Sequence, residues 1–320
     1  MHNIFVTGGF GFVGKFLTTK LVLKKKSVSL AARNKDNISN FKECSRIFNV
    51  EEFNSSTRWS NMFLNVDTII HCAAKAHVKN GNNPKFRDIY NEVNVKAVLN
   101  LANQAASTGV KRLIFLSSIG VNGLFTKKSN KFSNIDVPKP IENYAISKWE
   151  AEQELHQVSR RTGLEVVIIR APLVYGEGVK GNFLRLLDLV YKGMPLPFAN
   201  INNLRSFISL DNLVDFIICC IDHPKAAGQT FLVSDDEDIS TSDLIRKLSR
   251  IMGKSSRLFS MPKSIIKLMG YLTGKSVEVD RLLGSLRVDN SHVHKVLKWS
   301  PPFSLDEGLE KTVYWYLKNR

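Results

Sequence analysis

The sequence is poor in cysteine and has no long apolar run, and each absence excludes a class of protein. Its 320 residues include only four cysteines, Cys44, Cys72, Cys219 and Cys220, with no CxxC pair. This argues against a disulfide framework or a zinc site and predicts reduced thiols in a cytoplasmic protein. Apolar runs such as FIICCI are far shorter than the roughly 20 residues that span a bilayer. The opening residues MHNIFVTGG enter a predicted strand at once, so neither an integral membrane segment nor a signal peptide is expected.

Acidic residues are scarce relative to basic ones. Lys and Arg total 45 against 29 Asp and Glu, which gives a formal net charge of +16. Such a charge favours either a well-solvated surface or an anionic partner, namely a diphosphate substrate, an acidic membrane surface or nucleic acid. The densest basic runs, 24–26 and 127–128, lack the interleaved aromatic residues of a single-strand binder. We therefore expect no nucleic-acid partner, whereas a diphosphate substrate, a membrane surface and simple solvation all stay open.

Strand and helix patterns alternate through the first half of the chain. Strands are predicted over 3–7, 27–33, 45–50, 66–74, 111–119 and 165–171, and helices over 11–24, 91–109 and 143–162. The run VDTIIHCAA is typical of a parallel strand buried on both faces. This alternation predicts an α/β fold, a Rossmann-like doubly wound parallel sheet with helices on both sides.

The pattern changes after Pro172. Loops rich in Pro, Gly and Asn separate helices predicted near 211–222, 241–252, 262–272 and 305–318. We interpret this half as a smaller, interleaved C-terminal substrate-binding region. The predicted dinucleotide-binding domain spans 1–175 with returning segments near 205–235, and the substrate-binding region spans 176–204 and 236–320.

The segment FVTGGFGFVGKFL places Gly8, Gly11 and Gly14 between the first strand and the first helix. Glycines so placed permit a tight turn, a close approach of the backbone to a pyrophosphate, and close packing of helix on strand. The helix N-terminus then offers free N–H groups to the phosphates. The second strand is followed by Arg33, where an acidic residue would bind the ribose hydroxyls of NAD. An arginine there can pair with the 2′-phosphate of NADP, so NADP is favoured and NAD stays open.

The motif YAISK places Tyr144 and Lys148 on one face of a predicted helix. A tyrosine has a pKa of about 10, too high for a base near neutrality. The Lys148 ammonium and a positively charged nicotinamide ring are expected to lower it. Ser117 and Ser118 end the fifth strand, at the edge of the sheet where ligands bind in open α/β folds. A serine hydroxyl there can hold a substrate oxygen beside the tyrosine.

Two histidines, His71 and His77, lie near the end of the fourth predicted strand. No carboxylates at metal-ligand spacing accompany them. We therefore expect no metal, and we expect His71 to pack in the core.

An ordered set of motifs covers nearly the whole chain: TGGFGFVG (7–14), HCAAKAHV (71–78), NEVNVKAVLNL (91–101), FLSSIGVNG (115–123), YAISK (144–148), IIRAPLVYGEGVKGNF (168–183) and LRSFISLDNLVD (204–215). In this set the chain resembles the extended short-chain dehydrogenase/reductases, specifically their nucleotide-sugar epimerase/dehydratase/reductase group. The resemblance implies that Tyr144 is the general acid/base, that Lys148 is its partner and binds the nicotinamide ribose, and that Ser118 contacts the substrate. It also implies that Asn94 stabilises the helix supporting the site.

The same resemblance implies the remaining contacts. Those to the cofactor would come from Gly8, Gly11, Phe12, Gly14, Arg33, Ala73, Ala74, Lys75, Tyr144 and Lys148. Those to a UDP-sugar substrate would come from Ser118, Tyr175, Asn182 and, at the diphosphate, Arg205 and Arg281. A homodimer built from the helices around 91–109 and 143–162 is also implied.

Three reactions share the scaffold that the resemblance implies. A 4,6-dehydratase of this group carries an acidic pair directly after the active-site hydroxyl residue, whereas Ser118 is followed by Ile-Gly-Val, so dehydration is disfavoured. Arg33 favours NADPH-dependent reduction of a UDP-4-keto-6-deoxy-N-acetylhexosamine for O-antigen or polysaccharide synthesis. The alternative is a UDP-hexose or UDP-N-acetylglucosamine 4-epimerase with tightly bound NAD. A regulatory NADP-binding role is disfavoured because the tyrosine–lysine pair is retained.

Overall fold

A seven-stranded parallel sheet forms the centre of the chain. The computed structural model describes residues 2–33, 41, 43–76 and 84–320. Its strand order is β3-β2-β1-β4-β5-β6-β9, and every neighbouring pair is parallel. The bounds are β1 Asn3–Thr7, β2 Ser27–Ala32, β3 Arg46–Asn49, β4 Thr68–His71, β5 Arg112–Ser118, β6 Glu165–Ala171 and β9 Thr230–Leu232. The predicted doubly wound fold is confirmed, and the strand order reverses between β1 and β4, where such sheets bind ligands.

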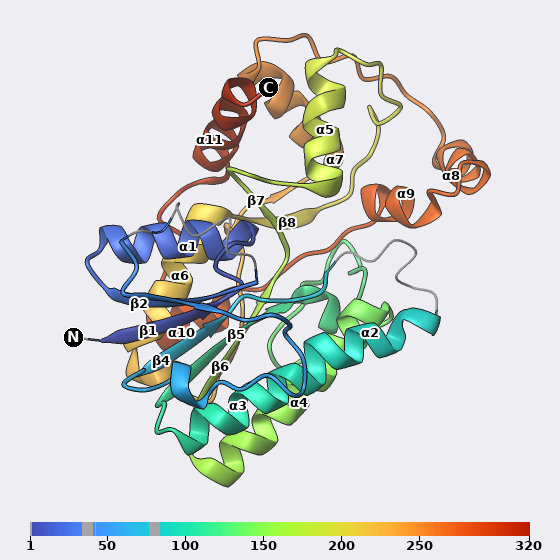
Figure 1. The fold of residues 1–320 in the computed structure, drawn as a ribbon. Helices are drawn as coiled ribbons and strands as arrows, with labels where there is room; N and C mark the ends of the chain where they lie inside the picture. The colour runs from blue at the N-terminus through green and yellow to red at the C-terminus, as the bar shows by residue number, and fades with distance from the viewer. Residues whose placement is uncertain (1, 34–40, 42, 77–83) are drawn as a thin grey trace.

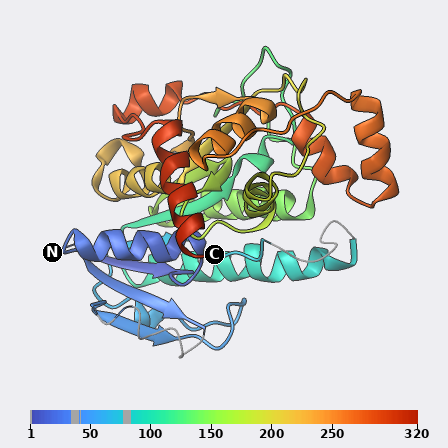
Figure 2. The same ribbon diagram turned by 90° about the horizontal axis from the view of Figure 1, so that it is seen from above.

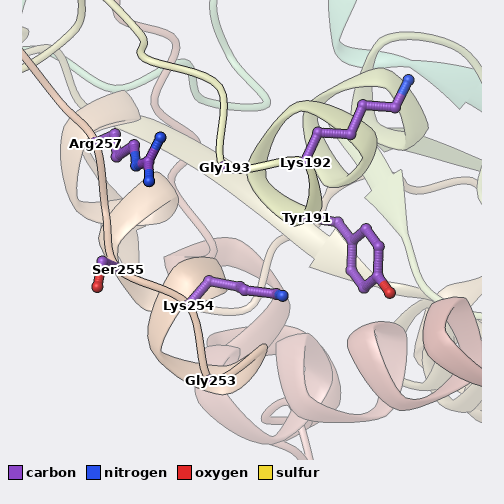
Figure 3. A pocket seen from close by; sticks show the side chains of 7 residues that line it. All are labelled: Tyr191, Lys192, Gly193, Gly253, Lys254, Ser255 and Arg257. Atoms are coloured by element: carbon purple, nitrogen blue, oxygen red, sulfur yellow. The ribbon is translucent and has the colours of Figure 1, made fainter.

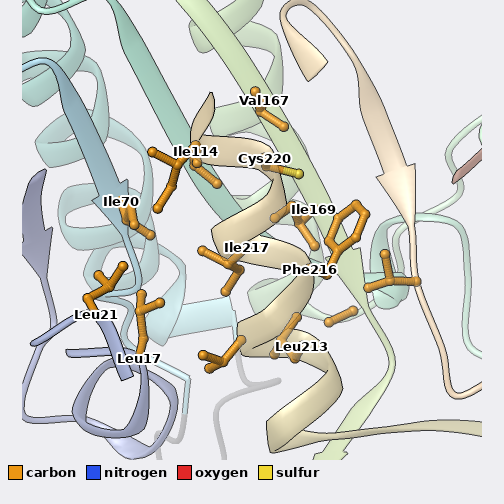
Figure 4. Packing of buried hydrophobic residues seen from close by; sticks show 14 of the residues in the cluster. Leu17, Leu21, Ile70, Ile114, Val167, Ile169, Leu213, Phe216, Ile217 and Cys220 are labelled. Atoms are coloured by element: carbon orange, nitrogen blue, oxygen red, sulfur yellow. The ribbon is translucent and has the colours of Figure 1, made fainter. Parts of the chain in front are cut away.

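Helices cover both faces of this sheet (Figure 1). The helices α1 (Phe12–Leu23), α6 (Leu210–Asp222) and α10 (Ser291–Leu297) lie on one face, and α3 (Ala97–Ser107) and α4 (Asn143–Thr162) lie on the other. Figure 4 shows the first interface, where α1 and α6 direct apolar side chains onto β4, β5 and β6. Because both faces are covered, the central strands are almost wholly apolar, as the run at 66–74 predicted.

The predicted helix at 91–109 is real but irregular. It begins as α2 (Arg87–Asn91), widens into a π-helical turn at Glu92–Lys96 and continues as α3. Such a turn inserts one extra residue into the helix and is frequent at functional sites. Here it carries Asn94, so the irregularity coincides with a residue singled out from the sequence.

A second, three-stranded sheet lies beyond the carboxyl edge of the first, where Figure 1 labels β7 and β8. Its order is β10-β8-β7, with bounds β7 Leu173–Tyr175, β8 Arg205–Ser209 and β10 Asp238–Ile239. The helices α5 (Gly181–Tyr191), α7 (Thr241–Ile251) and α11 (Leu305–Lys318) pack on it around an apolar core of their own. The chain therefore passes from the large sheet to the small one after β6, returns at β9 and leaves again at β10.

The helices α8 (Lys263–Leu272) and α9 (Ser276–Leu283) form a pair at the periphery. The helices α6, α7, α8 and α11 match the predicted ranges, whereas α5, α9 and α10 were not predicted. The helix α5 has a clear apolar repeat at Phe183, Leu187 and Val190, but the glycine-rich segment GEGVKG before it reads as a loop. Within the part of the chain that the structure describes, no helix is long and apolar enough to cross a membrane.

Candidate active site

The glycine loop between β1 and α1 is closed so tightly that side chains do not fit. The amide of Gly11 donates to the carbonyl of Gly8 at 2.9 Å. Gly8 has a φ of +70°, and a Cβ there would lie 2.6 Å from the Ala73 nitrogen. A Cβ on Gly14 would lie 2.1 Å from the Gly8 oxygen. The loop thus brings backbone atoms, not side chains, to the end of the sheet.

The N-terminus of α1 has the properties of an anion site. Gly11 is the N-cap and supplies no side-chain hydrogen bond, and the first turn, which begins with the half-buried Phe12, holds no acidic residue. Its N–H groups and the positive end of its dipole are therefore open to a phosphate. The exposed Arg33 directly follows β2, whose Ala31 pairs with Thr7 of β1. These residues fit the pyrophosphate and ribose of a dinucleotide, which would supply a hydride acceptor or donor at this edge.

Asn94 ties the loop after β4 to helix α4. Its side-chain oxygen accepts from the Lys75 amide at 2.9 Å, and its amide donates to the Lys75 carbonyl at 3.1 Å and to Ser147 Oγ at 3.0 Å. Ala73 packs on the glycine loop, and Ala74 and Lys75 are exposed beside it. This fully buried asparagine therefore fixes Lys75, in the segment predicted to line the cofactor.

Tyr144, Lys148 and Ser118 come together where α4 begins and β5 ends. The Lys148 ammonium donates to the carbonyl of Leu116 on β5 at 2.8 Å and lies 6.0 Å from the Tyr144 ring. Ser118 Oγ accepts from the Gly120 amide at 3.1 Å, and a Cβ on Gly120 would lie 3.2 Å from Ala145. The serine turn at the end of β5 thus packs on the first turn of α4.

The protein environment shifts the pKa values of this pair. Burial, with a smaller effect of Tyr90, raises the pKa of Tyr144 to about 12. Burial lowers the pKa of Lys148 to about 8, opposed by Cys72 and Glu152. In the polypeptide on its own, burial therefore raises the pKa of the phenol, and the lowering expected from Lys148 together with a bound nicotinamide stays a prediction.

A buried ion pair behind the site was not predicted. Glu152 of α4 is fully buried and forms a bidentate pair with Arg170 of β6, with an Nη2–Oε2 distance of 2.6 Å. The same carboxylate accepts from Ser117 Oγ, and Arg170 donates to Asn122 at 2.9 Å. The signal was present, because Glu152 falls one helical turn after Lys148 and Arg170 interrupts the apolar strand EVVIIRA. Ser117 is therefore buried and bound to this network, whereas Ser118 is half-buried at the end of β5.

Arg205 and Arg281, the predicted diphosphate contacts, lie together. Arg205 Nη1 donates to the carbonyls of Arg281 at 2.7 Å and of Gly284 at 3.3 Å. Burial and the neighbouring Arg281 charge lower the pKa of Arg205 to about 10. Arg281 is ion-paired with Glu142, the N-cap residue of α4. The arginine pair is therefore connected to the helix that carries Tyr144.

Two other predicted substrate contacts lie in different surroundings. Asn182 is exposed in the first turn of α5. Tyr175 is fully buried, stacks on Phe183 and donates from its hydroxyl to Asp235 at 2.7 Å. This corrects the expectation that Tyr175 faces the substrate, because its ring and hydroxyl are taken up by the core between β7 and α11. Burial raises the pKa of Asp235 to about 6.

The prediction that His71 packs in the core is confirmed, and His77 lies outside the described residues. His71 is fully buried, hydrogen-bonds Thr7 Oγ1 at 2.8 Å and stacks on Phe115. Burial lowers its pKa to about 3, so it is a neutral core residue. Among the described residues no three His, Cys, Asp or Glu side chains gather as a metal would require, and all four cysteines are free thiols.

A basic hollow lies apart from these residues. It has a volume of about 370 Å³ and lies between the end of α5 and the segment after α7 (Figure 3). Tyr191, Lys192, Lys254 and Arg257 line it. None of the residues predicted from the sequence contributes to this hollow.

Comparisons with known proteins agree with this arrangement. Residues 4–234 match the model of the NAD dependent epimerase/dehydratase family. A UDP-glucose 4-epimerase of Vibrio cholerae is 44% identical over 99% of this chain and 96% of its own length. An N-acetyl-alpha-D-glucosaminyl-diphospho-ditrans,octacis-undecaprenol 4-epimerase of Escherichia coli O157:H7 is 25% identical over 98% and 95%.

A solved structure extends the likeness to the fold. The UDP-glucuronic acid 4-epimerase of Bacillus cereus, in complex with UDP-glucuronic acid and NAD, superposes with a TM-score of 0.81 at 24% identity over 99% of this chain and 100% of that one. At this identity the likeness concerns the fold. The family match and the 44% identical relative establish that the chain belongs to the NAD-dependent epimerase/dehydratase family of enzymes.

Proposed function

We propose that this chain is a nucleotide-sugar 4-epimerase that acts on a UDP-hexose or a UDP-N-acetylhexosamine. The observation that carries the proposal is the packing of the Tyr144–Lys148 turn against the turn of Ser118 at the carboxyl end of β5, the edge of the sheet where the glycine loop follows β1. This packing supports a site in which a proton-transfer group, a cation and a hydroxyl act together. The 44% identical relative named as a UDP-glucose 4-epimerase supports the same reaction.

The residues would divide the work as follows. Ser118 would hold the C4 oxygen of the sugar, and Tyr144 would take the C4 hydroxyl proton and later return it. Since the Tyr144 pKa is about 12 in the polypeptide, it is a proton donor at neutral pH and needs added positive charge to act as a base. A bound oxidised nicotinamide would supply that charge together with hydride acceptance. Lys148 and the fixed loop held by Asn94 would orient the reacting groups.

The diphosphate of the substrate would lie between the two sheets. Arg205 and Arg281 are cations of this region; Arg205 is held by the Arg281 carbonyl, and Arg281 would bind phosphate beside its ion pair with Glu142. Epimerisation also requires the keto sugar to turn over between two hydride transfers, so the enzyme must hold the diphosphate while the ring moves. Arginine forks suit this task because they bind phosphate oxygens with fixed geometry.

A second candidate is the reduction of a UDP-4-keto-6-deoxy-N-acetylhexosamine with NADPH. The observation that favours it is the exposed Arg33 at the end of β2, where it can meet a 2′-phosphate. Both reactions use the same three side chains. They differ in whether reduced cofactor is consumed.

The test compares purified enzyme under three conditions. UDP-glucose and UDP-N-acetylglucosamine are incubated without added cofactor, and the keto sugar is incubated with NADPH, with products followed by chromatography and NADPH by absorbance. Appearance of the C4 epimer without NADPH loss supports the epimerase with NAD. Stoichiometric NADPH loss with the keto sugar, and no epimer, overturns it in favour of the reductase.

A variant pair ties the reaction to the site. Tyr144→Phe is expected to lower kcat by about 10²–10⁴, the usual contribution of a general acid/base. Tyr314→Phe, at an exposed position on α11, is the matched control and should leave the rate unchanged. Full activity in Tyr144→Phe would refute the assignment.

We also infer a homodimer through α3 and α4. The support is that these helices lie side by side across one face of the sheet (Figure 1). Sedimentation equilibrium measures the oligomeric state directly, and a monomer at micromolar concentration would contradict the inference.

A further inference from the structure

Helix α8 presents an apolar stripe to solvent. Of its ten residues only Ile266 and Gly270 are buried, and they hold it on α9, where a Cβ on Gly270 would lie 2.8 Å from Val279. On its outer side an i, i+3, i+4, i+7 stripe exposes between 45% and 74% of each side chain, and the stripe consists of Ile265, Leu268, Met269 and Leu272. Tyr271, 76% exposed, lies beside it. This spacing normally marks the face that a helix buries.

The segment around the stripe carries charge of one sign. Residues 253–277 include Lys254, Arg257, Lys263, Lys267 and Lys275 and no acidic residue, and of these Lys267 is ion-paired with Asp280 of α9 at 3.1 Å. Lys263 begins α8 and Lys275 follows its end, so cations bracket the stripe. Lys254 and Arg257 also line the basic hollow of Figure 3, from which the chain runs into α8. The occupant that complements this surface is both apolar and negatively charged.

The position of α8 leaves the stripe unobstructed. Figures 1 and 2 place α8 at the outer end of the C-terminal region. A second copy of this chain is a poor occupant. It would bring an identical set of cations against this one, and stable protein interfaces use roughly 20–30 residues a side. An apolar stripe flanked by lysines is instead the pattern of a helix that lies in a membrane interface.

We propose that α8 docks the enzyme onto the surface of an anionic phospholipid bilayer. The stripe would enter the boundary between head groups and acyl chains, and the bracketing cations would pair with acidic head groups. The helix is too short to span a bilayer, so the attachment is peripheral and reversible. This gives part of the +16 charge a definite partner. It also places the substrate-binding region, which α9 and Arg281 join to α8, next to the membrane.

The experiment is co-sedimentation of the full chain with vesicles. One set contains equal parts of phosphatidylglycerol and phosphatidylcholine, and the other contains phosphatidylcholine alone. Wild type is expected to bind the anionic vesicles, more weakly at high salt, and to bind the neutral vesicles at least about tenfold less. Absence of binding to anionic vesicles at low salt overturns the proposal.

Two double variants separate the apolar and electrostatic parts. Leu268→Gln with Leu272→Gln removes half of the stripe and should weaken binding about tenfold or more on anionic vesicles. Lys263→Glu with Lys275→Glu should weaken binding about tenfold or more on anionic vesicles and have little effect on neutral ones. Binding equal to wild type in both variants overturns the proposal even if the chain associates with lipid by another face.

Matched controls carry the same chemistry elsewhere. Leu23→Gln with Leu64→Gln is the control for the apolar variant, because these leucines are 70% and 61% exposed and lie outside α8. Lys24→Glu with Lys127→Glu is the control for the charge variant, at exposed lysines elsewhere on the chain. Both should bind like wild type, and equal losses in these controls would refute a docking site on α8. Thermal melting by circular dichroism shows that all variants fold, independently of any activity assay. If the α8 variants instead dissociate an oligomer in sedimentation, the stripe is a subunit contact and the proposal fails.

Discussion

Replacing Glu152 with glutamine should destabilise the protein far more than loss of an ordinary ion pair. Glu152 is fully buried and Arg170 is 4% exposed, so the guanidinium would keep its charge without a neutralising partner or water. Removing one member of such a pair costs about 3–5 kcal/mol, against about 0–1 kcal/mol for an exposed pair. We expect the loss in Glu152→Gln to be about 3 kcal/mol, because the amide still accepts one hydrogen bond.

A double variant that removes both members of the ion pair is the matched control, because it leaves no unpaired Arg170 charge in the core. Glu152→Gln combined with Arg170→Met leaves neither charge of this pair in the core, so the double variant should be more stable than the single one. Urea unfolding followed by circular dichroism gives the free energy of unfolding for wild type and the three variants, including Arg170→Met alone. A loss below about 1 kcal/mol in Glu152→Gln, or strictly additive losses in the double variant, would refute the reasoning.

The same substitution has a consequence for activity that packing alone would not produce. The Glu152 charge helps to raise the pKa of Lys148 against the dominant effect of burial, which brings it to about 8. Without that charge the pKa of Lys148 falls further, so the ammonium is lost at a lower pH. The alkaline limb of the kcat/KM profile should therefore move to lower pH in Glu152→Gln, and an unchanged limb would separate Glu152 from the catalytic lysine.

Three further predictions concern other parts of the site. Gly14→Ala places a Cβ 2.1 Å from the Gly8 oxygen, so the loop must open. The affinity for a dinucleotide, measured by calorimetric titration, should therefore fall at least about tenfold. Unchanged affinity would show that the loop does not hold the cofactor. Burial raises the pKa of Asp235 from 3.8 to about 6, so this carboxyl favours folding below pH 4 and loses that contribution as the pH rises through 6. Asp235→Asn removes this pH dependence. In urea titrations, the free energy of unfolding of the variant minus that of wild type should therefore rise by about 3 kcal/mol from pH 4 to pH 7. A difference that does not change with pH would contradict this. Arg205→Ala should raise KM for a UDP-sugar about tenfold or more with little effect on kcat, whereas a fall in kcat at constant KM would indicate a role in the chemical step.

Local patterns were sufficient to predict six of the seven strands of the large sheet, all except β9, and the position of its glycine loop. Apolar runs such as VDTIIHCAA have one stable solution in a chain that alternates strand and helix, namely burial between two helical layers. The position of Ser118 at the carboxyl end of β5 also followed from the pattern, and the rule that ligands bind at this edge of an open α/β sheet made it a candidate site residue. These inferences depend on contacts that every molecule of this architecture must form.

The surroundings of individual side chains were harder to predict. Tyr175 lies in a motif that suggested contact with substrate, yet its environment is set by Asp235 and α11, which are distant in sequence. The pKa of Tyr144 depends on how much water reaches the phenol, which no spacing of residues reports. The helix α9 gave no clear pattern because it is short and only Leu283 is buried in it. Long-range packing, rather than local propensity, decides each of these cases.

The crossing of the chain between its two sheets limits how this enzyme can diverge. Along the chain, β7 and β8 belong to the small sheet, β9 then adds the last strand of the large sheet, and β10 belongs to the small sheet again. A single breakpoint between two relatives therefore cannot exchange the substrate-binding region alone. A breakpoint between β8 and β10 divides the small sheet between the two parents, and one between β6 and β7 divides β6 from its partner β9 in the large sheet.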